Sequence, residues 1–149
     1  MSSTFSTIRT AVQTASQTVA PFSATTTQVV LGNYNWGPGT NFFANILTTG
    51  PWLFILPCSG EADGQQFNGE FDFFVDLVYG FANNANYDFT AIEDIQALLI
   101  QAWVRYSKFV SGLSLGPLRI SWSEPEVRSD ISPVVARTRF VLTGTFVAG

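Results

Sequence analysis

The longest regular pattern in the chain is an alternation of apolar and polar side chains between Phe67 and Tyr79. Alternation with period two over this length predicts a long, half-buried β-strand. The odd positions are mostly aromatic or aliphatic, whereas three even positions carry acids, Glu70, Asp72 and Asp76. Asp is a poor strand former. We therefore expect a charged face here, which either contacts a neighbouring subunit, lines a bore, or lies in solvent.

Two segments carry apolar residues at helical spacing. The first helix is expected to begin with a cap at Ser2 or Ser3 and to stop at Pro21. The second is expected to begin at Thr90, where Thr90 and Glu93 match a capping box, and to extend to about Phe109. Both helices have one apolar stripe, so each should pack against a sheet.

Four further segments predict strands, namely 26–31, 52–56, 118–122 and 136–146. The segments 59–66 and 124–133 are polar and are predicted to be loops. This order of elements predicts a single α+β domain spanning residues 1–149. Its core would be a mostly antiparallel four- to five-stranded sheet with two helices packed on one face.

The connection 32–50 is unusually aromatic for a loop. It either folds back on its own domain or inserts into a neighbour. Because exposed aromatic residues favour interfaces, we predict that Trp36, Phe42 and Phe43 anchor a subunit contact.

Basic residues gather near the C-terminus and acids near the middle of the chain. Arg137 and Arg139 are therefore candidates for pairing with the acids of a neighbouring subunit. The same segregation also arises when opposite charges lie on adjacent strands of one sheet, which needs no partner.

Composition favours assembly. Charged residues make up 12% of the chain and aromatic residues 15%, so much of the surface is expected to be buried against other subunits. A soluble domain with a neutral surface is the alternative. The net charge of −4 is not typical of a protein that reads nucleic-acid sequence.

Catalytic signals are weak. The chain has no histidine and one cysteine, Cys58, which excludes Ser–His and Cys–His nucleophile arrangements. We expect no enzyme activity, no cofactor and no metal. Two weaker options remain, a hydrolytic carboxylate pair at Glu70 and Asp72 and a hard cation held by Glu61, Asp63 and Glu70.

The sequence also lacks the patterns that are typical of a membrane span and of an export signal. No segment approaches the roughly 20 apolar residues that span a bilayer, and the first residues do not match a signal peptide. We expect synthesis and folding in a cytoplasm, without a membrane partner.

The leading helix, the buried PWLFILP strand, the long FNGEFDFFVDLVYGF strand, the capped helix and the two closing strands resemble the tail terminator proteins of long-tailed bacteriophages. This resemblance covers most of the chain and rests on element order, size and composition. It implies a non-enzymatic virion protein that forms a hexameric ring on the tail tube and docks the neck of the head. The tail tube protein and a neck or head-completion protein would be its partners, and DNA would pass through the bore.

Two other functions remain open. One is another neck or head-completion protein, which only its position in the particle would distinguish. The second is a small cellular ligand-binding α+β domain that uses the aromatic loop as a pocket lid. Such a domain would remain monomeric and gain thermal stability from its ligand.

Overall fold

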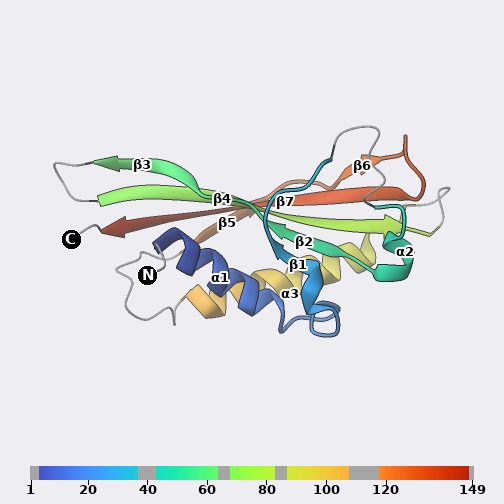
Figure 1. The fold of residues 1–149 in the computed structure, drawn as a ribbon, viewed down its shortest axis with the longest axis horizontal. Helices are drawn as coiled ribbons and strands as arrows, with labels where there is room; N and C mark the ends of the chain where they lie inside the picture. The colour runs from blue at the N-terminus through green and yellow to red at the C-terminus, as the bar shows by residue number, and fades with distance from the viewer. Residues whose placement is uncertain (1–3, 37–42, 64–67, 83–86, 108–117, 148–149) are drawn as a thin grey trace.

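A computed structural model describes residues 4–36, 43–63, 68–82, 87–107 and 118–147. Within these ranges the chain is a mixed α+β domain with a seven-stranded sheet (Figure 1). The elements in chain order are α1 (Thr4–Ser16), a 3-10 turn (Thr26–Gln28), β1 (Val29–Leu31), α2 (Ile46–Thr49), β2 (Trp52–Ile55), β3 (Ser59–Asp63), β4 (Asn68–Phe81), α3 (Thr90–Ser107), β5 (Arg119–Trp122), β6 (Glu126–Arg128) and β7 (Val134–Val147).

The centre of the sheet is one long antiparallel pair, β4 with β7. Their register extends from Asn68 opposite Val147 to Phe81 opposite Val134. Strands β2 and β3 follow one another along the outer edge of β4, while β5 and β6 follow one another along the outer edge of β7. Strand β1 pairs parallel with β2, and the other pairs are antiparallel. Strands β2, β3, β5 and β6 therefore take their positions from this central pair, and β1 takes its position from β2.

The predicted α+β class and the mostly antiparallel sheet are confirmed, but the sheet has more strands than expected. Strands β3 and β6 lie in segments that were predicted to be loops. Both are short edge strands positioned by main-chain pairing with β4 and β7. Strand β3 is polar and exposed, and β6 contributes only Val127 to the apolar layer. Alternation of hydrophobicity therefore gave no signal for them. The short helix α2 inside the aromatic connection was also not expected.

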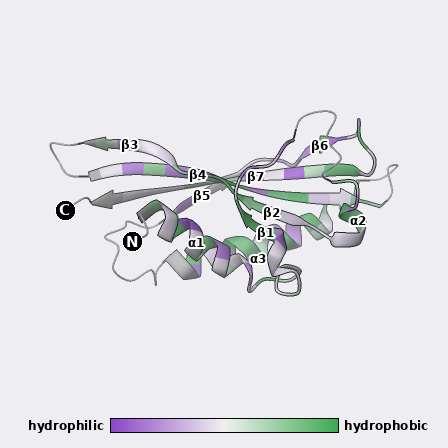
Figure 2. Cartoon of the chain, in the orientation of Figure 1, coloured by the Kyte–Doolittle hydropathy of each residue, from purple (hydrophilic) through white to green (hydrophobic). Residues whose placement is uncertain are grey.

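Helices α1 and α3 lie against one face of the sheet, which we call the first face (Figure 1). The odd positions of β4 point into this layer, so Phe71, Phe73, Val75 and Leu77 are buried. Figure 2 shows the resulting alternation of hydrophobic and hydrophilic bands along β4. This part of the sequence pattern predicted the structure correctly.

One polar contact lies inside that apolar layer. Trp103 of α3 is buried, and its ring packs edge-on against Phe140 with centroids 4.9 Å apart. Its indole N–H donates to Ser16 Oγ of α1 at 2.8 Å, and Ser16 Oγ donates to the Val12 carbonyl at 2.7 Å. The hydroxyl thus connects the two helices while both polar groups remain satisfied.

The start of α3 differs from the predicted capping box. Asp88 Oδ1 accepts a hydrogen bond from the Thr90 N–H at 2.9 Å, and the Glu93 N–H donates to the Phe89 carbonyl. Hydrogen bonds from Thr90 lower the pKa of the Asp88 carboxyl. Asp88 therefore caps the helix, and Thr90 is its first residue. The cap predicted at Ser2 or Ser3 lies outside the described residues.

We predict that Ser16→Ala lowers the free energy of unfolding by about 1–3 kcal/mol, because it leaves the buried Trp103 N–H without an acceptor. Urea denaturation monitored by tryptophan fluorescence measures this loss. Thr10→Ala, at an exposed position of the same helix, is the matched control and should stay within about 0.5 kcal/mol of wild type. Equal stability of all three proteins would contradict this role for Ser16.

Candidate functional site

The even positions of β4 lie on the second face of the sheet, opposite the helices, and this face has two parts. Around Phe54, Val78 and Val135, the segments 32–36 and 43–46 pack onto it as a small second core, which we call the covered half. The open half consists of Glu61, Glu70, Asp72, Phe74 and Arg119, which the pairing register places on the same face.

Asp76 lies at the boundary between the halves, and its side chain is 0% exposed. Arg139, directly opposite on β7, donates from Nε to Oδ1 and from Nη2 to Oδ2, each at 2.9 Å. The Tyr34 hydroxyl donates to Oδ2 at 2.7 Å. The expectation that Asp76 belongs to an exposed acidic face is therefore wrong, because the strand register and the returning loop bury it.

A second arginine extends this network. Arg137 Nη1 donates to the Tyr34 hydroxyl oxygen at 3.2 Å, and Nη2 donates to Glu126 Oε2 at 2.6 Å. The hydrogen bond from Arg137 holds the pKa of Glu126 below its usual value. Asp76 with Arg139 and Glu126 with Arg137 are both cross-strand pairs. The charge segregation in the sequence is thus partly explained by pairing within one sheet.

Tyr34 joins the loop to this network. Burial is the main reason that the pKa of its phenol is raised above the ordinary range, and the negative charge of Asp76 raises it further. Arg137 opposes that shift. The phenol therefore stays protonated and keeps donating to Asp76 well into the alkaline range.

The described parts of the aromatic connection, 32–36 and 43–50, fold back on their own domain. Phe43 is 2% exposed in the second core, so it is not available to a neighbouring subunit. The half-buried Trp36 packs edge-on against Phe43, and the Arg137 guanidinium lies 4.6 Å from its ring centroid. Arg128 also donates from Nη1 to the Trp36 carbonyl. Phe42 lies outside the described residues, so its predicted interface role stays a prediction.

The open half carries surplus negative charge. Glu61 on β3 lies directly opposite Glu70 on β4, and both are exposed. Like charges placed opposite one another destabilise a sheet. Asp72 is half-buried and accepts a hydrogen bond from Ser59 Oγ at 2.5 Å. Glu70 and Asp72 thus form part of an acidic surface, although their role at a bore or interface stays a prediction.

An exposed aromatic ring adjoins this acidic surface. Phe74 is 39% exposed, and the Arg139 guanidinium lies 4.5 Å from its ring centroid. Because Arg139 also binds the buried Asp76, this ion pair holds the edge of the open half in place. The open half therefore combines negative charge, a partly exposed ring and a rigid support.

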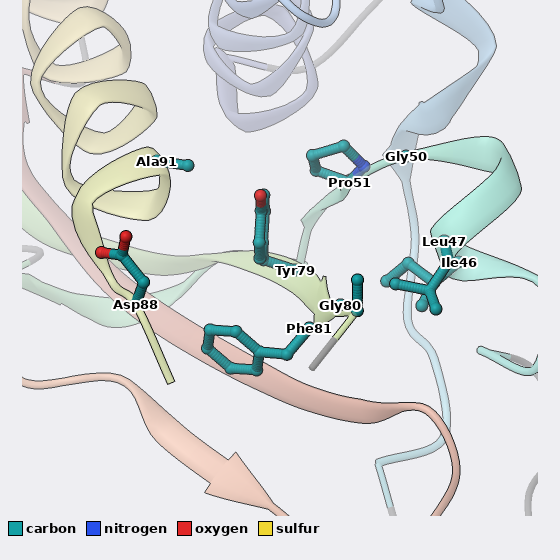
Figure 3. A pocket seen from close by; sticks show the side chains of 10 residues that line it. Ile46, Leu47, Gly50, Pro51, Tyr79, Gly80, Phe81, Asp88 and Ala91 are labelled. Atoms are coloured by element: carbon teal, nitrogen blue, oxygen red, sulfur yellow. The ribbon is translucent and has the colours of Figure 1, made fainter. Parts of the chain in front are cut away.

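A separate pocket lies between α2, the end of β4 and the start of α3 (Figure 3). Its volume is about 430 Å³, and its walls include Ile46, Leu47, Phe81 and Tyr79. Its one carboxylate, Asp88, already accepts a hydrogen bond from the N-terminus of α3. The pocket has room for a small apolar group, but it offers few unengaged polar atoms to orient one.

Within the described residues, no three Cys, Asp or Glu side chains are grouped so that they could hold a metal ion. Among the helices described, none combines the length and apolarity that crossing a bilayer requires.

Sequence analysis did not identify Tyr34 or Glu126 as site residues. Tyr34 lies in a connection without periodicity, and Glu126 lies in an edge strand that the pattern did not predict. Glu126 and Arg137 are close in sequence, an acid and a base on the two sides of a polar segment. That spacing is the signal that could have indicated their pairing.

Comparison with known proteins gives a fold but no family. No protein-family model and no curated protein matches the chain. Among solved structures, a chain of the "Virion of native gene transfer agent (GTA) particle" matches with a TM-score of 0.59 and 17% sequence identity, over 94% of both chains. The protein therefore shares its fold, over nearly its whole length, with a component of that virion.

We predict that Arg139→Met lowers the free energy of unfolding by about 3–5 kcal/mol, because it leaves the buried Asp76 carboxylate without its ion-pair partner. Asp76→Asn should cost less, since the half-exposed Arg139 side chain can turn to water. Chemical denaturation measures both. Arg105→Met, on the exposed side of α3, is the control and should change the free energy of unfolding little. An effect of Arg139→Met as small as that of Arg105→Met would contradict this role of the ion pair.

Deprotonation of the Tyr34 phenol should lower the free energy of unfolding at alkaline pH. Its folded-state pKa lies above the unfolded value of about 10, so its contribution is present below pH 10 and is lost as the pH rises further. We predict that Tyr34→Phe costs about 1–3 kcal/mol at neutral pH and reduces the alkaline loss. Thermal unfolding of both proteins between pH 7 and 11 tests this. The same fall in melting temperature with rising pH in wild type and in Tyr34→Phe would contradict it.

Proposed function

We propose that the chain is a structural subunit of a phage-like virion and acts as a tail terminator. Copies would form a ring, six in the family that it resembles, which caps the tail tube and joins it to the neck of the head. The observation that carries this proposal is the fold shared with a virion component over 94% of both chains. The role requires surfaces rather than catalysis, which agrees with a chain that lacks histidine.

The second face supports a role in assembly. Its covered half is filled by the chain's own loop, whereas its open half presents Glu61, Glu70 and Asp72 beside the exposed Phe74. A carboxylate surface repels phosphate and does not retain DNA, the opposite of a basic binding groove. An open half that faces a bore would let DNA pass without binding.

A second candidate function is supported by the pocket beside α2. It would make the protein a monomeric domain that binds a small apolar ligand through Ile46, Leu47 and Phe81. Because Asp88 is engaged in capping α3, we favour the structural role. A gain in thermal stability with a small ligand, in a protein that is monomeric at all concentrations, would reverse this preference.

We predict that an early stop codon in the gene, introduced in the virus or particle-producing strain that encodes it, gives over-long tail tubes without heads. Without a terminator ring, nothing stops the addition of tube subunits. Negative-stain electron microscopy of the lysate measures tube length. A strain in which the gene is restored from a plasmid is the control and should give tails of wild-type length.

The other outcomes distinguish the alternatives. Tails of normal length beside unattached, filled heads would contradict the terminator role and assign the protein to the neck. Particles of normal form and titre would contradict any structural role in the virion.

A further inference from the structure

Four strands of the sheet, β1, β3, β5 and β6, have an outer edge that no described strand covers. Of these, β3 and β5 lie on opposite sides of the central pair and are the most exposed. Strand β3 lies along the first part of β4, and β5 lies along the second half of β7. Residues 59–62 of β3 are exposed, as are Arg119, Ser121 and Trp122 of β5. Edge strands present main-chain N–H and C=O groups in a row, which makes them ready templates for pairing with another chain.

The directions of these edges are compatible with each other. Strand β3 is antiparallel to β4, β4 is antiparallel to β7, and β7 is antiparallel to β5. Strands β3 and β5 therefore run in opposite directions. When a second copy is placed beside the first with its sheet facing the same way, its β5 meets the first copy's β3 in antiparallel orientation, which forms a regular ladder.

The charges on the two edges are complementary. Glu61 is opposite Glu70, which is opposite Thr145, whereas Arg119 is opposite Thr143. Positions 143 and 145 share a face, so Glu61 and Arg119 lie on the same second face. Glu61 has a like-charged neighbour in Glu70. The exposed Arg119 forms no ion pair with any described residue.

We infer that the β3 edge of one copy pairs with the β5 edge of the next, with Glu61 of one copy against Arg119 of the other. The inference rests on the proposed assembly and names the surfaces that carry it. The interface joins two different edges, so it repeats around an axis and can close into a ring. It would also cover Trp122, which is 52% exposed in one copy. Large aromatic residues of this kind commonly anchor interfaces.

Such pairing has a consequence for the acidic surface. The sheets of successive copies would be continuous, with α1 and α3 on the first face and Glu70 and Asp72 on the second. With the open half turned towards the axis, as the proposed function requires, the helix layer would form the outside of the ring. Closing the ring would also cover the exposed edges of β3 and β5.

Charge reversal tests the pairing. The variants are Glu61→Arg, Arg119→Glu and the double exchange, followed by sedimentation velocity over a concentration series. We expect each single change to raise the concentration for half-assembly at least about tenfold through like-charge repulsion, and the double exchange to recover most of that loss. Asp94→Arg and Arg105→Glu, at exposed positions of α3, are matched controls that should assemble as wild type does.

Cross-linking gives a second readout that does not depend on repulsion. Glu61→Cys and Arg119→Cys are made in separate proteins that also carry Cys58→Ser, and the two are mixed with oxidised glutathione. A disulfide-linked dimer is expected in the mixture and not in either protein alone. Glu61→Cys mixed with Leu98→Cys, an exposed position on α3, is the control and should not cross-link.

The outcomes separate the inference from the proposed function. Assembly that is insensitive to charge reversal and gives no specific cross-link would overturn the β3–β5 pairing and leave the virion role standing. A folded wild-type protein that remains monomeric and unlinked at every concentration would overturn the pairing and the proposed self-assembly together.

Discussion

The fourteen-residue antiparallel pair of β4 and β7 is the constraint on which the rest of the structure depends. Its register decides which side chains share a face, because residues directly opposite one another project to the same side. It places Phe71 and Phe73 under the helices and aligns Asp76 with Arg139. Strands β2, β3, β5 and β6 attach to its two edges. A slip of one residue would exchange the two faces along the whole sheet.

The ion pair of Asp76 and Arg139 divides the second face. On one side, Tyr34 brings the aromatic connection onto the sheet and closes a second core around Phe54. On the other side, the same face remains open and acidic. A buried ion pair is weak evidence for stability. Here the pair marks the boundary between the covered half and the open half, because Arg139 contacts Asp76 on one side and the Phe74 ring of the open half on the other.

The sequence predicted the fold class and the long central strand well, since alternation over many residues depends on local chemistry alone. It could not separate Asp76 from Glu70, because both are acids at even positions of one strand. Which of them is buried depends on Arg139 and Tyr34, which are remote in sequence. Phe43 was misplaced for a related reason, since an aromatic loop residue has the same local pattern whether it packs within its own chain or against another. Edge strand β3 gave no hydrophobic signal.

The central claim of this account is that the edges of β3 and β5 form the contact between subunits. Hydrogen–deuterium exchange, compared between dilute monomer and the assembled protein, tests it most directly. The account predicts that amides of 59–62 and 119–122 exchange rapidly in the monomer and slowly in the assembly, while those at the centre of β4 and β7 stay slow in both. Equal exchange of the two edges in monomer and assembly would contradict it.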